Sequence, residues 1–161
     1  MTKLRLFCLG GFMLVLGAAA TGIAGAQSAK PSVTVEFQMY SGRRNPVVVI
    51  TDPSILAKLQ SSLATSRKLA RNSLAPSREY EMGYTGTVIK NDNGVNIADE
   101  TLVHRRQIVT RSRARVATAA PSEGYAEDAS GDIESALIEY AAAAGAISAN
   151  ERAYLLQQAA K

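Results

Sequence analysis

The sequence is poor in the residues that most often build metal centres, disulfides and nucleophilic active sites. Its 161 residues include one cysteine, one histidine and no tryptophan. One histidine and one cysteine are too few for a zinc site of the usual kind, so we expect no metal and no cofactor. With 20% charged residues the chain is not a highly charged disordered protein. Its length fits one domain plus, at most, a processed segment.

The first 26 residues have the three parts of a secretory signal peptide. Two basic residues open the chain, residues 6–16 are strongly apolar, and a small-x-small motif ends at Ala26. We predict cleavage between Ala26 and Gln27, which leaves residues 27–161 as an exported domain, either periplasmic or secreted. Because the two basic residues leave with the signal peptide, the net charge falls from +4 to about +2.

The alternatives to a cleaved signal peptide are an uncleaved membrane anchor and a lipid anchor. Residues 6–26 are uncharged and long enough to span a bilayer, but their second half is rich in small residues. Cys8 lies inside the apolar run, with no apolar region before it, so it is a poor lipidation site. After cleavage the domain has no cysteine and no membrane span, so we expect it to fold without disulfides.

The exported part opens with a predicted β-hairpin. Residues 27–32 form a polar leader that we expect to be mobile. Residues 33–40 alternate between apolar and polar side chains, which is typical of a half-buried strand. Residues 47–51 form a continuous apolar run typical of a more buried strand, and the turn residues of the 41–46 segment separate the two. This arrangement predicts an antiparallel hairpin.

Helix signals follow at three places. Asp52 and the proline after it predict a helix that starts there and ends near Ser66, followed by a polar loop over residues 67–79. A second helix is predicted from Asp132, as its N-cap, to about residue 144. A capping box of the Ser-x-x-Glu type predicts a last helix over residues 149–159.

The remaining segments predict a second hairpin and a connector. Residues 84–90 form a strand, and the 91–94 turn returns the chain in a register that sets Val88 opposite Ile97. Residues 117–131 read as an exposed connector. The fold class is therefore α+β: antiparallel β-hairpins packed against about three α-helices in a single small domain.

The motif Ser-Gly-Arg-Arg-Asn-Pro lies between two strands and is followed by a Leu-rich helix and by Gly-Tyr-x-Gly before another strand. This pattern, over roughly residues 33–89, resembles a group of small uncharacterised proteins with Ser-Gly-Arg-Pro-Asn-Pro at this place. Here Arg44 replaces the first proline of that motif. The resemblance implies a similar strand–turn–strand–helix fold. The group has no established activity, so the resemblance implies no site.

The 41–46 turn is the best candidate binding site. Its glycine permits a positive φ, its Asn-Pro pair stiffens the chain, and its two arginines suit carboxylate or phosphate partners. A protruding arginine on a rigid loop could also serve a protease inhibitor. Alternatively, these residues only build the turn. The candidate residues are Ser41, Gly42, Arg43, Arg44 and Asn45.

A second candidate is a basic stretch that contains no acidic residue and precedes an acidic segment at residues 123–139. It could bind an anionic envelope component or another protein. We do not expect nucleic acid as a partner, because the domain is expected outside the cytoplasm. Alternatively, the two charged segments are solvated or neutralise each other. The basic residues are Arg105, Arg106, Arg111, Arg113 and Arg115.

No catalytic motif is recognisable. His104 is the only histidine, and we expect it to face solvent on a strand or loop. The chain has no Gly-x-Ser-x-Gly after the signal peptide and no phosphate-binding glycine loop. We therefore expect an exported, non-catalytic binding or envelope-associated module with no catalytic residues. A hydrolase whose site cannot be recognised is the alternative.

Overall fold

The computed structural model describes residues 30–39, 42, 44–70, 83–113 and 120–160. Within these ranges the chain forms a single sheet and three helices, which confirms the α+β class and the single small domain. The signal peptide and its cleavage point at Ala26 and Gln27 lie outside the described residues and stay predictions. The elements are β1 (Ser32–Gln38), β2 (Val47–Ile50), α1 (Pro53–Thr65), β3 (Arg67–Lys68), β4 (Gly86–Asn93), β5 (Glu100–His104), β6 (Gln107–Ser112), β7 (Ser122–Glu127), α2 (Asp132–Ala143) and α3 (Ala149–Ala159).

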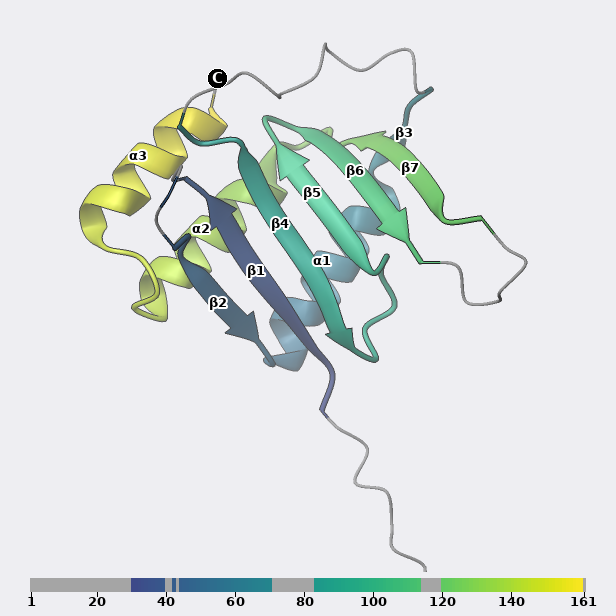
Figure 1. Cartoon of the computed structure of the whole chain (residues 1–161), viewed down its shortest axis with the longest axis horizontal. Coiled ribbons are helices and arrows are strands. Elements are labelled where there is room, and N and C mark those ends of the chain that lie inside the picture. Colours follow the sequence, from purple (N-terminus) through teal and green to yellow (C-terminus); the bar gives the residue numbers. More distant parts are fainter. Residues whose placement is uncertain (1–29, 40–41, 43, 71–82, 114–119, 161) are drawn as a thin grey trace, which may run out of the picture.

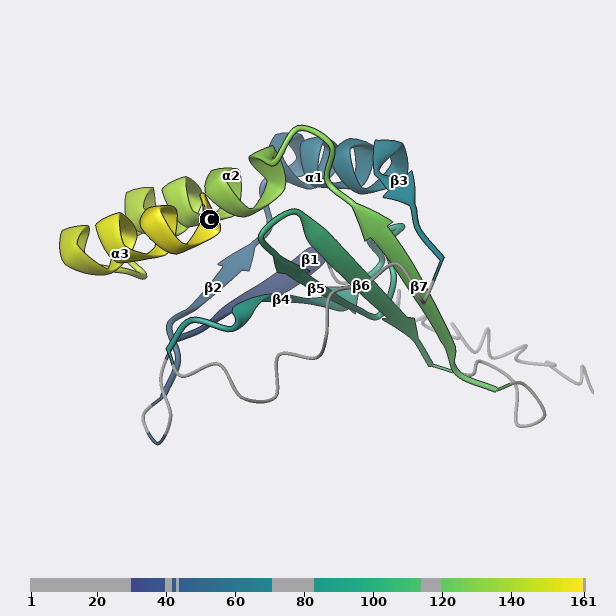
Figure 2. The same ribbon diagram turned by 90° about the horizontal axis from the view of Figure 1, so that it is seen from above.

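The sheet has seven strands in the order β2-β1-β4-β5-β6-β7-β3, and every neighbouring pair is antiparallel. Figure 1 looks onto its open face, with α1 and α2 behind the strands. Figure 2 shows the helices gathered on one side of a strongly bent sheet. Helix α1 connects the two edge strands, because it follows β2 and leads directly into β3. The sheet therefore has one face covered by helices and two edges of different sequence.

The predicted hairpin of β1 and β2 is confirmed, with Val35 opposite Val48. Side chains of β1 alternate between partly and fully buried, as period-two patterning requires. Phe37 is fully buried and belongs to the same apolar cluster as Leu56 and Leu59 of α1. The alternation in β1 thus directs one row of apolar side chains into the helix layer.

The predicted register of the second hairpin is wrong. Val88 lies opposite Leu102 and not opposite Ile97, because β4 continues into the predicted turn as far as Asn93 and β5 starts only at Glu100. The side-chain amide of Asn91 donates to the carbonyls of Val95 (2.7 Å) and Ile97 (3.2 Å). These bonds hold a wider loop between β4 and β5. Val95 and Ile97 still pack against the core, but from the loop.

The prediction of an exposed connector over residues 117–131 also needs correction, because strand β7 occupies its middle. Residues 114–119 lie outside the described part, but Ser122–Glu127 pairs with β6 on one side and with β3 on the other. Its small and acidic residues have low strand propensity, so the ladder hydrogen bonds of both neighbours decide its conformation. Strand β3 similarly starts within the predicted 67–79 loop. The leader is shorter than predicted, since Ser32 already belongs to β1.

The helices agree closely with their predicted signals. Asp52 caps α1, accepting hydrogen bonds from the backbone N–H groups of Ser54 and Ile55. Ser148 and Glu151 form the predicted capping box of α3. Gly131, and not Asp132, is the N-cap residue of α2, with a φ of 73°. In the described ranges, no helix has the length and apolar character needed to cross a membrane.

Candidate functional site

The 41–46 turn holds its shape through Asn45. The Asn45 Oδ1 accepts a hydrogen bond from the backbone N–H of Met39 (3.0 Å), and its Nδ2 donates to Glu36 Oε1 (3.0 Å). The Asn45 hydrogen bond and the Lys90 ammonium together hold the pKa of the Glu36 carboxyl below its ordinary value. Asn45 therefore has a structural role at the end of the hairpin.

Of the other candidate residues of this turn, the structure describes two. Gly42 has a φ of 90°, as its predicted role requires, and Arg44 is exposed. Ser41 and Arg43 lie outside the described residues. The turn therefore presents one exposed cation, Arg44, in the described part of the chain. The binding site at this turn stays a prediction.

The described arginines of the predicted basic patch lie in two settings. Arg111 lies between two acidic neighbours on adjacent strands, with its Nε 3.2 Å from Glu123 Oε1 and its Nη1 3.2 Å from Glu100 Oε1. The hydrogen bond to Glu123, aided by Glu100, raises the pKa of the Arg111 guanidinium. Arg113 follows on the same strand end, and Arg115 lies outside the described residues. The predicted mutual neutralisation of the basic and acidic segments is thus observed at Arg111.

The first two arginines of the predicted basic patch line a groove with other cationic residues. Arg105 and Arg106 form the two-residue turn between β5 and β6, which lies beside the edge strand β3. Together they border a groove of about 540 Å³. Four of its lining side chains are cationic and one is a carboxylate, so the lining carries a net charge of +3. We call this the basic groove, and its lining residues are Arg67, Lys68, Leu69, Arg105, Arg106, Gln107 and Glu127.

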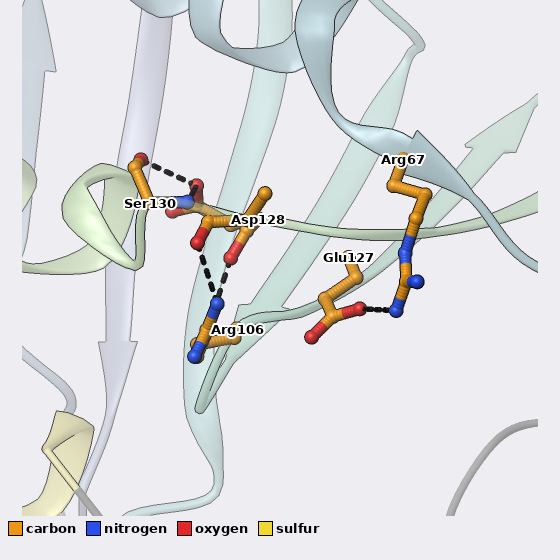
Figure 3. Close-up of polar contacts among 6 residues, drawn as sticks. Arg67, Arg106, Glu127, Asp128 and Ser130 are labelled. Atoms are coloured by element: carbon orange, nitrogen blue, oxygen red, sulfur yellow. Dashed lines mark hydrogen bonds and ion pairs between the residues drawn. The ribbon is translucent and has the colours of Figure 1, made fainter.

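The one carboxylate of the basic groove is held by Arg67. Arg67 and Glu127 are directly opposite each other in the β3–β7 ladder, and the Arg67 guanidinium donates to the Glu127 carboxylate (Figure 3). The Arg67 side chain is nevertheless 69% exposed. Exposed ion pairs contribute at most about 1 kcal/mol, so Arg67 can exchange Glu127 for a stronger anionic partner.

Arg106 is held in place by backbone groups. Its Nε donates to the carbonyl of Asp128 (3.1 Å), and its Nη2 donates to the carbonyl of Ala129. In return the Asp128 N–H donates to the Arg106 carbonyl (2.7 Å). The Asp128 carboxylate accepts from the Ser130 hydroxyl (Figure 3). It also accepts from the N–H of Ile133 at the start of α2. Two N–H donors of the Arg106 guanidinium are thereby bound to backbone carbonyls, which fixes this side chain at the rim of the basic groove.

The turn that carries these arginines is strained. Arg105 has a φ of 46° and Arg106 a φ of 70°. Positive φ at both central residues is the signature of a type I′ hairpin turn, for which Asn-Gly is the preferred sequence. For other residues the left-handed region costs roughly 1–2 kcal/mol each. Strained backbone concentrates at functional sites, so this turn is a candidate site.

A buried polar cluster supports the turn from below. Glu134 Oε2 accepts the Arg105 N–H at 3.0 Å, and its other oxygen accepts from the Tyr84 hydroxyl. Tyr84 OH also lies 2.7 Å from Thr87 Oγ1. His104, expected to face solvent, is 5% exposed, and its ring centroid is 5.7 Å from that of Tyr84. These side chains are closed to solvent and position the turn.

The sequence did not reveal that Arg67 and Lys68 belong to this site. They follow α1 in a segment predicted as a loop, far along the chain from Arg105 and Arg106. Only the ladder of β7 with both β3 and β6 brings the two pairs together. The one available signal was a pair of adjacent basic residues directly after a helix.

The described residues contain no group of three or more His, Cys, Asp or Glu side chains that could hold a metal ion. The basic groove carries an excess of cationic side chains, which suits an anionic ligand. Comparison of the chain with protein-family models, with curated proteins and with solved structures gave no match.

Proposed function

We propose that this protein is an exported, non-catalytic binding module whose ligand is anionic and binds in the basic groove. The proposal keeps the export expected from residues 1–26 and gives the binding role a location. An anionic component of the cell envelope is the partner that this combination favours. The hydrolase and the protease-inhibitor alternatives stay hypotheses that no contact of the described residues supports.

The observation that carries the proposal is the arginine pair in the strained turn. Arg105 and Arg106 occupy positions where Asn-Gly would fold at lower cost. The structure keeps them there through Glu134 and the carbonyl of Asp128. Two arginines at positions that disfavour their backbone conformation are best explained if their positive charges bind a ligand.

The chemistry of the basic groove suits phosphate or carboxylate groups. Arginine presents a planar fork that matches both groups, and the lysine adds a compact charge. Arg67 and Lys68 come from an edge strand, whereas Arg105 and Arg106 come from a turn. Four cations from two elements line one groove, and an anionic ligand there competes with the contacts that Arg67 and Arg106 already make.

Binding can be tested with two polymers of defined chemistry. Inorganic polyphosphate supplies phosphoryl groups, and polygalacturonate supplies carboxylates. Isothermal titration at several salt concentrations should show affinity for at least one of them, decreasing as salt rises. Lys68→Ala should weaken this binding by about tenfold, the effect of losing one charge-assisted contact.

Lys58→Ala provides the matched control. Lys58 is an exposed lysine of α1 that borders a different, mainly apolar groove between α1 and α2. Its loss removes the same charge but leaves the basic groove intact, so binding should stay within about twofold. Equal losses in both variants would mean nonspecific attraction, and no binding of either polymer would reject the anionic ligand.

Export can be tested separately by mass spectrometry. Expression of the full chain should yield an extracytoplasmic protein that begins at Gln27, because the small-x-small motif ends at Ala26. A protein that keeps Met1, or a lipid on Cys8, would reject this part of the proposal without affecting the basic groove.

A further inference from the structure

The two edges of the sheet differ in how they are protected from pairing with other strands. Strand β3 is an edge of two residues, and both are cationic. Strand β2, the other edge, is Val-Val-Val-Ile and has no charged residue. Native proteins usually protect an edge with charge, proline or a bulge, because its unpaired backbone groups invite another strand. Within β2 none of these devices is present.

The outward residues of β2 are apolar and exposed. Val47 is 48% exposed and Val49 is 53% exposed, whereas Val48 and Ile50 are buried. Val47 and Val49 are two of the three large hydrophobic residues that are exposed in the described ranges. The exposed apolar side chains of the described residues are therefore concentrated on the β2 edge.

The backbone of the same two residues points away from the sheet. The Phe37 N–H donates to the Pro46 carbonyl at 3.0 Å, which makes these two residues a hydrogen-bonded pair. Such pairs alternate along an antiparallel ladder, so Val48 and Ile50 use their N–H and C=O groups toward β1. The N–H and C=O groups of Val47 and Val49 are therefore directed outward at the edge.

From these observations we infer that β2 is a self-association edge, at which a second copy of this chain adds its own β2 antiparallel across a two-fold axis at Val48. In this register Val47 lies opposite Val49 of the second copy, and Val49 lies opposite Val47. All outward N–H and C=O groups of these residues then pair, and the four valine side chains form one apolar strip on the open face.

Charge complementarity favours a second copy over an unrelated strand. Continuing the same register outward places Arg44 opposite Asp52 of the second copy, and by symmetry the contact occurs twice. Both residues are exposed, and they carry opposite charges. In the monomer, hydrogen bonds from Ser54 and Ile55 already stabilise the ionised Asp52 and lower its pKa, so the carboxylate is charged at neutral pH. The same register thus pairs the outward backbone groups, brings the exposed valines together and sets opposite charges opposite each other.

Strands β2 and β3 are the opposite edges of the sheet (Figure 1). The basic groove is lined by β3 and not by β2, so the β2 edge is independent of it. Failure of anion binding would leave this inference standing, and failure of self-association would leave the basic groove unaffected.

Sedimentation equilibrium and amide hydrogen exchange test the inference on the protein obtained by expressing the full chain. Association should depend on concentration, and the amides of Val47 and Val49 should gain protection as concentration rises. The amides of Val48 and Ile50 should be protected at every concentration. A protein that stays monomeric up to about 1 mM, the range of the weakest complexes, would overturn the proposal. So would concentration-dependent protection that leaves the β2 amides unchanged.

Three variants separate pairing from general charge effects. Val49→Lys puts a charge on the edge and should raise the dissociation constant at least tenfold, while circular dichroism confirms that the fold is kept. Ala64→Lys adds the same charge at an exposed position near the other end of α1 and should leave association unchanged. Arg44→Asp sets like charges opposite Asp52 and should weaken association by severalfold, less so at high salt.

Unchanged association in Val49→Lys would overturn the proposal. Should Val49→Lys fail to fold, Arg44→Asp replaces it as the deciding variant, and unchanged association in Arg44→Asp would overturn the proposed register.

Discussion

Glu134, in the first turn of α2, accepts a hydrogen bond at 3.0 Å from the backbone N–H of Arg105, in the turn between β5 and β6. The contact joins the helix layer to the sheet at the point where the backbone of the turn is strained. Glu134 is 3% exposed, and its carboxylate accepts from this N–H and from the Tyr84 hydroxyl. The conformation of the basic groove therefore depends on a side chain that does not line it.

Glu134→Ala should lower the free energy of unfolding by roughly 2–4 kcal/mol. The change removes the buried acceptor of the part-buried Arg105 N–H and of the buried Tyr84 hydroxyl, and a lost partner of this kind costs about 1–3 kcal/mol. Urea unfolding followed by circular dichroism measures the difference. Asp132→Ala removes an exposed acid from the same helical turn and should cost less than about 1 kcal/mol. Similar losses in both variants would show that helix electrostatics, and not the contact with Arg105, is responsible.

Substitutions at Arg105 should separate backbone strain from charge. Arg105→Asn keeps the N–H that Glu134 binds and tolerates a φ of 46°, so it should not lower stability. Arg105→Val is β-branched and should be less stable than Arg105→Asn by about 1–2 kcal/mol. Both variants should bind polyphosphate or polygalacturonate less tightly than the parent. A stable valine variant would contradict the positive φ of this turn.

The acid dependence of stability should include a contribution from Glu36. The Asn45 amide first, and then Lys90, lower the pKa of the Glu36 carboxyl in the folded protein. A carboxyl with a lowered folded pKa adds stability above its unfolded pKa, near 4.3, and loses it as the pH falls through the folded value. Glu36→Gln should therefore flatten the decrease in stability between about pH 5 and about pH 3.

An NMR titration assigns the cause of this shift. In Asn45→Ala and in Lys90→Met the pKa of Glu36 should rise toward its ordinary value, because the Asn45 hydrogen bond and then the hydrogen bond and charge of Lys90 all lower it. An unchanged pKa in Asn45→Ala would contradict the hydrogen bond between Asn45 and Glu36.

Substitutions at Gly86 and Gly94 compare a position with close neighbours and a position without them. Both have positive φ, 131° at Gly86 and 65° at Gly94. A Cβ at Gly86 would lie 2.8 Å from the carbonyl oxygen of Val103, whereas a Cβ at Gly94 would meet open space. Gly94→Ala should cost about 1 kcal/mol, the left-handed penalty alone, and Gly86→Ala more than about 2 kcal/mol. Thermal unfolding distinguishes the two, and equal costs would contradict the close approach at Gly86.

Local signals in the sequence were sufficient for much of the fold. The alternation in β1 and the caps at Asp52 and Ser148 act within a few residues, so they predicted the first hairpin and two helix starts. Strand β7 had no such signal, because its conformation depends on hydrogen bonds to β6 and β3. The register of β4 was likewise decided by Asn91, whose amide stabilises a wider loop than the turn residues alone predict.

For the site, the sequence alone determined which residues were available: few groups for metal or nucleophilic chemistry, and arginines in two stretches. It did not determine which of them act together. The tertiary structure neutralised Arg111 between Glu100 and Glu123 and set Arg105 beside Arg67. Pairing between distant strands decides such neighbours. Composition and local pattern act along the chain, whereas charges combine or cancel according to distance in space.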